Sequence, residues 1–180
     1  MSNPSSEDTV VDILTTVGTA GTADYTEVTT TVTIPAGDTS VDVTVPTTED
    51  TIDEIDEDFT VDGTVTSGNT ANTDPSGTVT ILDDDDAPTI TISDVDVTEG
   101  DDAVVTVELS NPSSEDIVVD IVTTVGTAGS DDYTEVTTTV TIPAGDTSVD
   151  VTVPTTEDDI DEADEDFTVC LLYTSDAADD

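Results

Sequence analysis

The sequence predicts an all-β protein built from tandem antiparallel β-sandwiches, and three observations carry this prediction. Apolar and polar residues alternate along many short segments, which is the pattern of half-buried strands. Threonine and valine dominate, 10 glycines and 8 prolines punctuate the chain, and no long helix-forming stretch is present. Residues 2–61 recur at 110–169 without a gap, and only 6 of these 60 positions differ. An offset of 108 residues exceeds the about 20–50 residues of a solenoid unit and suits whole domains in tandem.

The alternating segments predict the strands in order along the chain. They are residues 32–34, 41–45, 59–61 and 79–81, followed by 90–92, 105–109, 117–125 and 149–153. The sequence Pro35-Ala36-Gly37-Asp38 predicts a turn between the first two. Residues 41–45 and their copy 149–153 place valines on one face and Asp or Thr on the other. About seven strands per repeat favour a sandwich in which each sheet has one solvated side.

The repeat also predicts the domain boundaries, at residues 1–86 and 87–169. Residues 87–169 followed by 62–86 make one complete unit of 108 residues. We therefore expect the first copy to lack the counterparts of strands 89–97 and 101–109. We expect the second copy to lack the counterparts of residues 62–82, so that neither closes a full sandwich by itself.

Both ends of the sequence interrupt the repeat. Met1 stands where the second copy has Leu109, so we expect the chain to begin inside a repeat. The match stops between Val169 and Cys170, and residues 170–180 resemble a translated sequencing adapter. We therefore expect residues 170–180 to be a non-native tail, leave them out of the fold prediction, and assign no function to the single cysteine.

The charge of the chain restricts its partners. It has 45 Asp and Glu, no Lys, Arg or His, and a formal net charge of −45. Nucleic acid and anionic membrane surfaces are bound through Lys and Arg, so we expect neither as a partner, and no apolar run is long enough to insert into a membrane. The usual catalytic bases, amines and thiolates are missing. A carboxylate pair of glycosidase type remains open by composition, but clusters this dense serve a cation better, and we expect no enzyme activity.

Four acidic groups fall in loops, and they are the strongest signal of a site. They are Glu99 with Asp101, Asp131 with Asp132 (Asp24 in the first copy), the run 49–58 with its copy from Glu157, and Asp83–Asp86 at the repeat junction. Ca²⁺ takes about six to eight hard oxygen ligands, which converging loops can supply. Zinc and copper prefer His and Cys, which the repeat lacks. The loops therefore predict Ca²⁺ binding, and a merely solvated acidic surface is the alternative.

At these residues the chain resembles the Calx-beta domain family. The resemblance runs through residues 97–100, 126–133, 141–146, 164–167 and 78–85. It implies a seven-stranded immunoglobulin-like sandwich with Ca²⁺ at one tip, beside the linker to the next domain. Beside the ligands, Tyr25 and Tyr133 are expected to pack, and Phe59 and Phe167 to lie in the core.

The resemblance also implies the Ca²⁺ ligands in each copy. In the first copy these are Asp24, Glu49, Asp50, the carbonyl of Ile52, Glu54, Asp83, Asp84 and Asp85. In the second copy they are Glu99, Asp132, Glu157, Asp158, the carbonyl of Ile160 and Glu162. The first copy has no counterpart of Glu99 and the second has none of Asp83–Asp85, so we expect both sites to be incomplete.

Together these features predict a calcium-binding repeat of an exported or cell-surface adhesin, whose partners are the neighbouring repeats. Ca²⁺ would neutralise the junction aspartates and stiffen the array. Two alternatives stay open: a Ca²⁺-sensing regulatory domain of a membrane transporter or signalling protein, and a passive acidic spacer adapted to high salt. The near-identity of the two copies argues against the Ca²⁺-sensing domain, because the binding sites of sensors diversify whereas spacers are copied.

Overall fold

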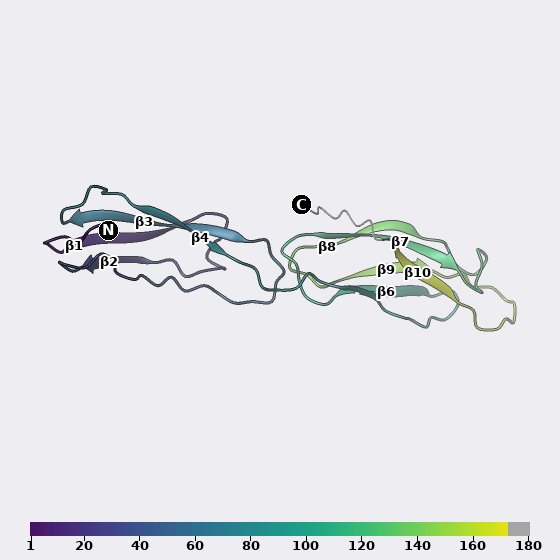
Figure 1. Ribbon diagram of the computed structural model, residues 1–180. Coiled ribbons are helices and arrows are strands. Elements are labelled where there is room, and N and C mark those ends of the chain that lie inside the picture. The colour runs from purple at the N-terminus through teal and green to yellow at the C-terminus, as the bar shows by residue number, and fades with distance from the viewer. Residues whose placement is uncertain (173–180) are drawn as a thin grey trace. The chain divides into compact units, whose positions relative to one another are not determined.

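The computed structural model describes residues 1–172, which form ten strands and no helix (Figure 1). The strands are β1 Thr9–Val17, β2 Thr29–Ile34, β3 Glu57–Ser67, β4 Ser76–Ile81, β5 Ile90–Ile92, β6 Asp102–Leu109, β7 Ile117–Val125, β8 Thr137–Ile142, β9 Ser148–Pro154 and β10 Phe167–Leu172. Every pairing between these strands is antiparallel. The all-β prediction is confirmed. No helix long and apolar enough to cross a membrane is found among the described residues.

The chain divides into two compact units. The first comprises residues 1–50 and 55–84, and the second comprises residues 51–54 and the chain from Asp85 onward. Residues 51–54 group with the second unit through backbone hydrogen bonds of Asp53. Its N–H donates to Pro112 O at 3.1 Å, and its carbonyl accepts from Ser114 N at 2.9 Å.

The first unit is built on one four-stranded sheet in the order β2-β1-β3-β4. Its buried cluster is small and consists of Ala20, Tyr25 and Phe59. The two rings stack with centroids 4.1 Å apart and planes inclined by 12°. The expectation that Tyr25 packs and Phe59 lies in the core is confirmed.

The second unit is a sandwich of two three-stranded sheets, β10-β7-β8 and β5-β6-β9. Its main buried cluster draws side chains from both sheets, among them Val107 on β6, Ile121 on β7, Ile142 on β8 and Val151 on β9. Alternate residues of β6 are buried, as period-2 packing between two sheets requires. The apolar faces of the two sheets therefore bury each other.

One identical heptapeptide has different structures in the two units. Ser148–Pro154 forms β9 and pairs with β6, whereas the same sequence at 40–46 forms no strand. The strand predicted at 41–45 is therefore wrong, while its copy at 149–153 is confirmed. The reason is the partner: residues 148–154 pair with β6, whereas no strand among the described residues pairs with residues 40–46. Alternation creates a strand only where a neighbour accepts its hydrogen bonds.

Because residues 40–46 have no paired strand, side chains at matched positions are buried to different extents in the two units. Ile121 and Ile142 are 1% and 0% exposed, whereas their copies Ile13 and Ile34 are half-buried. Val151 is 4% exposed, whereas its copy Val43 is half-buried. The same side chains thus contribute more burial free energy in the second unit.

The strand predicted at 90–92 is confirmed, and no other strand lies within 89–97. Cys170, Leu171 and Leu172, which the fold prediction left out, continue β10 and pair with β7. They do so because their backbone extends the ladder begun at Phe167, whatever their origin. The rest of the expected tail, residues 173–180, lies outside the described residues.

We predict that the matched substitutions Val151→Ala and Val43→Ala lower the free energy of unfolding by different amounts. Val151→Ala should lower the free energy of unfolding of the second unit by about 2 kcal/mol, through lost burial and a residual cavity. Val43→Ala should cost less than about 1 kcal/mol, because that side chain is already partly in water. Calorimetric unfolding of the two variants tests this, and equal costs would contradict the difference in packing.

Candidate metal centre

Five carboxylates gather at one end of the second unit, in two groups of three that share Glu162. One group is Glu99, Asp158 and Glu162, and the other is Asp132, Glu162 and Glu165. Within each group, one oxygen per residue lies within 4.8 Å of the others. We call these five residues the carboxylate cluster. Oxygens that bind one Ca²⁺ from opposite sides are about 4.6–5.2 Å apart, so each group has the spacing of a shared ion.

Glu99 is presented by a tight turn at residues 98–101. Asp101 N donates to Thr98 O at 3.0 Å, and Gly100 has φ of 83°, the left-handed value that a type II turn requires at this position. Thr155, just after β9, fixes the turn: its hydroxyl accepts from Gly100 N at 2.9 Å and donates to Asp101 O at 2.7 Å. The Glu99 carboxylate then accepts from Asp158 N at 3.2 Å, which joins the two acidic loops.

Asp132 is the half-buried member of the cluster, and the backbone around it is well fixed. Its carboxylate accepts a hydrogen bond from Gly129 N at 2.5 Å, and its carbonyl accepts from Thr156 N at 2.8 Å. The next residue, Tyr133, is 2% exposed and stacks on Phe167 with ring centroids 4.2 Å apart. The expected packing of Tyr133 is confirmed. The stacked pair fixes the residue next to Asp132 and so restricts where the Asp132 carboxylate can lie.

The charges of the cluster oppose one another. Partial desolvation and the neighbouring negative charges, Asp158 first among them, raise the pKa of Glu162 above its ordinary value. The pKa of Glu165 is raised in the same direction by partial desolvation and by Asp132. The chain has no Lys, Arg or His with which to neutralise these groups. A cation at this end would relieve the repulsion.

A cavity of about 970 Å³ opens beside the cluster in the second unit. Glu99, Asp132, Glu162 and Glu165 line it, together with the buried ring of Tyr133. An ion therefore has an open route to these carboxylates from solvent.

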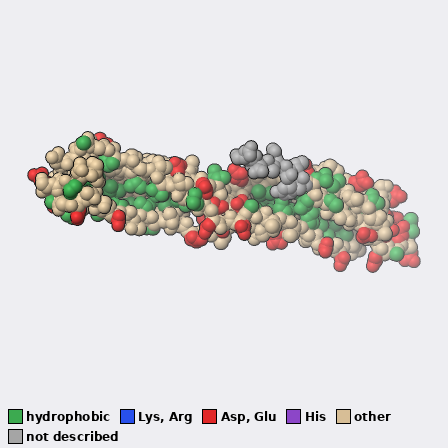
Figure 2. All heavy atoms as spheres, in the orientation of Figure 1, with side chains coloured by type: hydrophobic (Ala, Val, Ile, Leu, Met, Phe, Trp, Pro, Cys, Tyr) green, Lys and Arg blue, Asp and Glu red, His purple; other side chains and the backbone are tan. Residues whose placement is uncertain are grey.

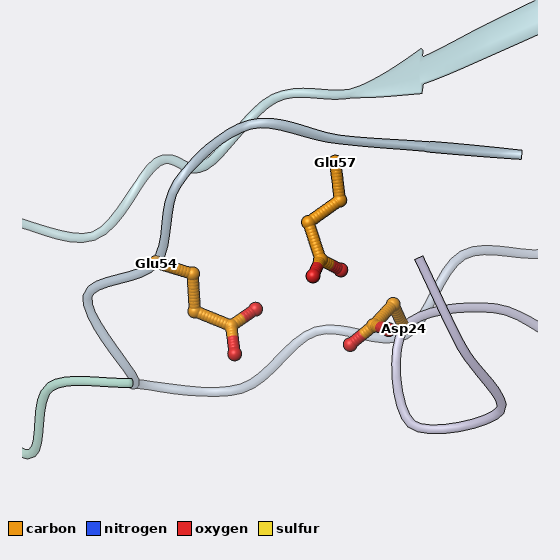
Figure 3. Close-up of side chains that lie close together, drawn as sticks. All are labelled: Asp24, Glu54 and Glu57. Atoms are coloured by element: carbon orange, nitrogen blue, oxygen red, sulfur yellow. The ribbon is translucent and has the colours of Figure 1, made fainter. Parts of the chain in front are cut away.

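Part of the second group recurs in the first unit. Asp24 and Glu57, the counterparts of Asp132 and Glu165, again lie with carboxylate oxygens within 4.8 Å of one another, and Figure 3 shows these two side chains turned toward a common space. Gly21 N donates to the Asp24 carboxylate at 2.6 Å, as Gly129 N does to Asp132. The loop that presents the aspartate is therefore the same in both copies.

A sequence profile of the family described as "Domain of unknown function (DUF5006)" matches residues 3–179. The chain belongs to this family. The Calx-beta membership expected from the motifs stays a prediction. No curated protein sequence matches this DUF5006 chain.

Two solved structures are similar to this DUF5006 chain. One is described as the crystal structure of CBD12 from CALX1.2, with 19% identity and a TM-score of 0.44. The other is described as the crystal structure of calcium binding domain CBD12 of CALX1.1, with 20% identity and a TM-score of 0.42. In both comparisons the match covers 92% of this chain and 68% of the solved one.

The structure brings together some of the ligands expected in this DUF5006 chain and leaves others apart. Glu99, Asp132, Asp158 and Glu162 meet in the second unit, and Asp24 lies beside Glu57 in the first unit. Glu54 groups with the second unit. Glu157 faces Gly100, where an added Cβ would come within 2.8 Å of the Glu157 Cβ. Ile160 donates its N–H to the Asp158 carboxylate at 2.6 Å. Glu49, Asp50, Ile52, Asp83, Asp84 and Asp85 lie outside the three carboxylate groups found among residues 1–172.

Glu57 and Glu165 are the members that sequence reasoning did not select. Each stands two residues before the phenylalanine that stacks on a tyrosine, and that tyrosine follows the cluster aspartate. Side chains two apart on an extended chain share a face, so the glutamate falls beside the aspartate. Counting back two residues from Phe59 and Phe167 would have found both.

We predict that Glu162→Gln raises the unfolding temperature at pH 7 when divalent cations are chelated. A carboxyl whose folded-state pKa is raised destabilises the fold when charged, and this cost disappears as the pH falls through that pKa. The gain should therefore shrink below about pH 4, where the glutamate is protonated. Thermal unfolding at both pH values measures it.

The matched control is Glu115→Gln, which removes the same charge from an exposed residue outside the three carboxylate groups. A Glu162→Gln variant no more stable than Glu115→Gln at pH 7 would contradict the repulsion.

Proposed function

We propose that this chain is a calcium-binding module whose ions bind at the carboxylate cluster of each intact repeat. The observation that carries the proposal is the pair of carboxylate groups joined by Glu162. Glu162 would bridge two adjacent cation positions, with Glu99 and Asp158 on one side and Asp132 and Glu165 on the other. Water and backbone carbonyls would complete the about six to eight ligands that Ca²⁺ takes.

The chemistry of the donor set favours Ca²⁺ over other metals. The three groups contain carboxylates alone, which are hard oxygen donors. Structural Zn²⁺ sites use mainly Cys and His, and Mg²⁺ requires near-octahedral geometry and retains several waters. Four of the five cluster residues are exposed and sit on loops, so the site can adopt the loose geometry that Ca²⁺ accepts.

We further propose that the module is an extender in an exported or cell-surface adhesin and that its partners are neighbouring repeats. The near-identity of the two copies supports a spacer role, because a spacer gains length by copying. Ca²⁺ would neutralise the acidic loops and the junction run Asp83–Asp86, and so stiffen the array. No catalytic role is proposed.

A passive acidic spacer is the second candidate, and one observation favours it. Asp12 and Asp120 lie on strands away from the cluster, where each accepts a hydrogen bond from a threonine on the next strand, at 2.6 and 2.5 Å. Such pairs make a soluble, salt-tolerant surface without any metal. The response to Ca²⁺ separates the two roles.

We predict that the unfolding temperature of the chain rises with Ca²⁺ and ignores Mg²⁺ or Na⁺ at equal ionic strength. A ligand that binds only the folded state stabilises it by about 2.7 kcal/mol at 100 times its Kd. Glu162→Gln should remove most of the Ca²⁺ response because it belongs to both groups, and Glu115→Gln should retain it. A melt that follows ionic strength alone would refute calcium binding and leave the passive spacer.

We also predict that Ca²⁺ extends or stiffens the chain in solution. Small-angle scattering with Ca²⁺ or with chelator should give a larger maximum dimension in Ca²⁺, because ions bound at the junction aspartates would restrict bending between neighbouring repeats. A variant with Asp83–Asp86 changed to asparagine provides the control, because the proposal places the stiffening at that run. An unchanged profile beside a Ca²⁺-dependent melt would reject the extender role while keeping the calcium site.

A further inference from the structure

We propose that residues 51–54 are a docking segment through which each repeat binds the next repeat of the array, and that residues 110–116 are the loop that receives it. In sequence the docking segment lies inside the first copy, between residues 50 and 55 of the first unit, yet it groups with the second unit. This inference rests on the proposed extender role and names the surface that would join neighbouring repeats. It requires no bound ion.

Asp53 binds the docking segment to the receiving loop through its backbone. Its N–H donates to Pro112 O at 3.1 Å, and its carbonyl accepts from Ser114 N at 2.9 Å. These two hydrogen bonds form a parallel bridge with Ser113, the residue between the two partners. A pair of backbone hydrogen bonds fixes both the direction and the register of the bound segment.

The side chain of Ser113 adds a contact at the centre of the bridge. Ser113 is 4% exposed, and its hydroxyl donates to the Asp53 carboxylate at 3.4 Å. The same hydroxyl accepts from Glu115 N at 3.3 Å. A buried hydroxyl is costly to leave without partners, so Ser113 favours a state in which the docking segment is bound. The contact also accommodates a carboxylate without any cationic side chain, which this chain does not have.

The receiving loop also binds the chain that enters the second unit. Asn111 Nδ2 donates to Asp86 O at 2.9 Å, and Thr89 N donates to Ser110 Oγ at the same distance. Asp86 is the last residue of the first repeat in sequence. The receiving loop therefore contacts both the docking segment and the junction between the two copies.

Both halves of the contact recur in the other copy. The receiving loop has the same sequence at residues 2–8, and residues 52–54 recur at 160–162. Positions 51 and 55, two of the six that differ between the copies, flank the repeated tripeptide and do not fall inside it. We therefore expect every repeat to offer one docking segment and one receiving loop.

The receiving loop has the same internal hydrogen bond in both units. Gly145 N donates to Ser113 O at 2.8 Å, and its counterpart Gly37 N donates to Ser5 O at 2.9 Å. Because the segment and the loop belong to one chain, their effective concentration is high, and the contact does not need a high affinity of its own.

The test is disulfide trapping in the full chain. The side-chain oxygens of Asp53 and Ser113 are 3.4 Å apart, so cysteines at these two positions can form a disulfide. The variant Asp53→Cys with Ser113→Cys, in a Cys170→Ser background, is oxidised at high dilution in the presence of chelator. Mass spectrometry then measures the rate at which the intramolecular disulfide forms.

Two control pairs each keep one of these cysteines. Asp53→Cys with Ser114→Cys moves the second cysteine by one residue, to an exposed side chain on the opposite side of the bridge. Asp161→Cys with Ser113→Cys replaces Asp53 by its counterpart in the second copy. Asp161 follows β9 at one end of the β6–β9 pair, whereas the receiving loop follows β6 at the other end. We expect both control pairs to react at least tenfold more slowly than the test pair.

Proteolysis of the unsubstituted chain tests the same contact without cysteines. An endoprotease that cleaves before aspartate meets the same residues at the bond between Ile52 and Asp53 and at its copy between Ile160 and Asp161. A backbone held in a bridge must open before it can enter a protease. We expect initial cleavage before Asp53 to be at least tenfold slower than cleavage before Asp161, without added Ca²⁺.

Equal rates of disulfide formation in the three pairs, or equal cleavage at the two bonds, would overturn the proposal. Disulfide formation that requires Ca²⁺ would overturn it as well, because an ion would then hold the segment. The melt and the scattering profile of the unsubstituted chain report on calcium binding and on the extender role separately.

Discussion

The absence of any cationic side chain is the constraint on which the rest of this structure depends. Forty-five carboxylates must be satisfied with no Lys, Arg or His in the chain. On the sheets this is done with hydroxyls: Asp62 accepts hydrogen bonds from Ser76, Thr16 and Thr60, which lower its pKa. Threonine is suited both to forming the strands and to satisfying their carboxylates, since it favours strands and its hydroxyl donates one hydrogen bond to a neighbouring strand. The abundance of threonine is thus explained by the same constraint.

Hydroxyl pairing works on the sheets because register places a threonine opposite the aspartates of β1 and β7. Asp12 is opposite Thr31, and Asp120 is opposite Thr139. The loops at the end of the second unit have no such register, and there the carboxylates face one another. The difference between the two surfaces therefore arises from geometry, because the same residue type is satisfied on a strand and crowded in a loop.

The sequence alone was sufficient for features that depend on local pattern. The alternation of β6 follows from a simple period, and the turn before residue 40 follows from residues close together. The sequence alone was insufficient where the structure of a segment depends on a residue or strand far away in the chain. Residues 40–46 and 148–154 cannot be distinguished by any property of their own, and only the strand beside them makes one of them β9. Glu165 was missed for a related reason, since its closeness to Asp132 results from an aromatic stack formed across 34 positions of the chain.

The repeated heptapeptide has a consequence for measuring local opening. Residues 24–50 and 132–158 are identical, so each amide from Tyr25 to Asp50 has the same residue before it as its copy and therefore the same intrinsic hydrogen-exchange rate. When NMR resolves the two copies, the ratio of their exchange rates cancels sequence effects, pH and temperature. What remains is the protection that a neighbouring strand gives to a backbone hydrogen bond, measured inside one molecule with its own reference.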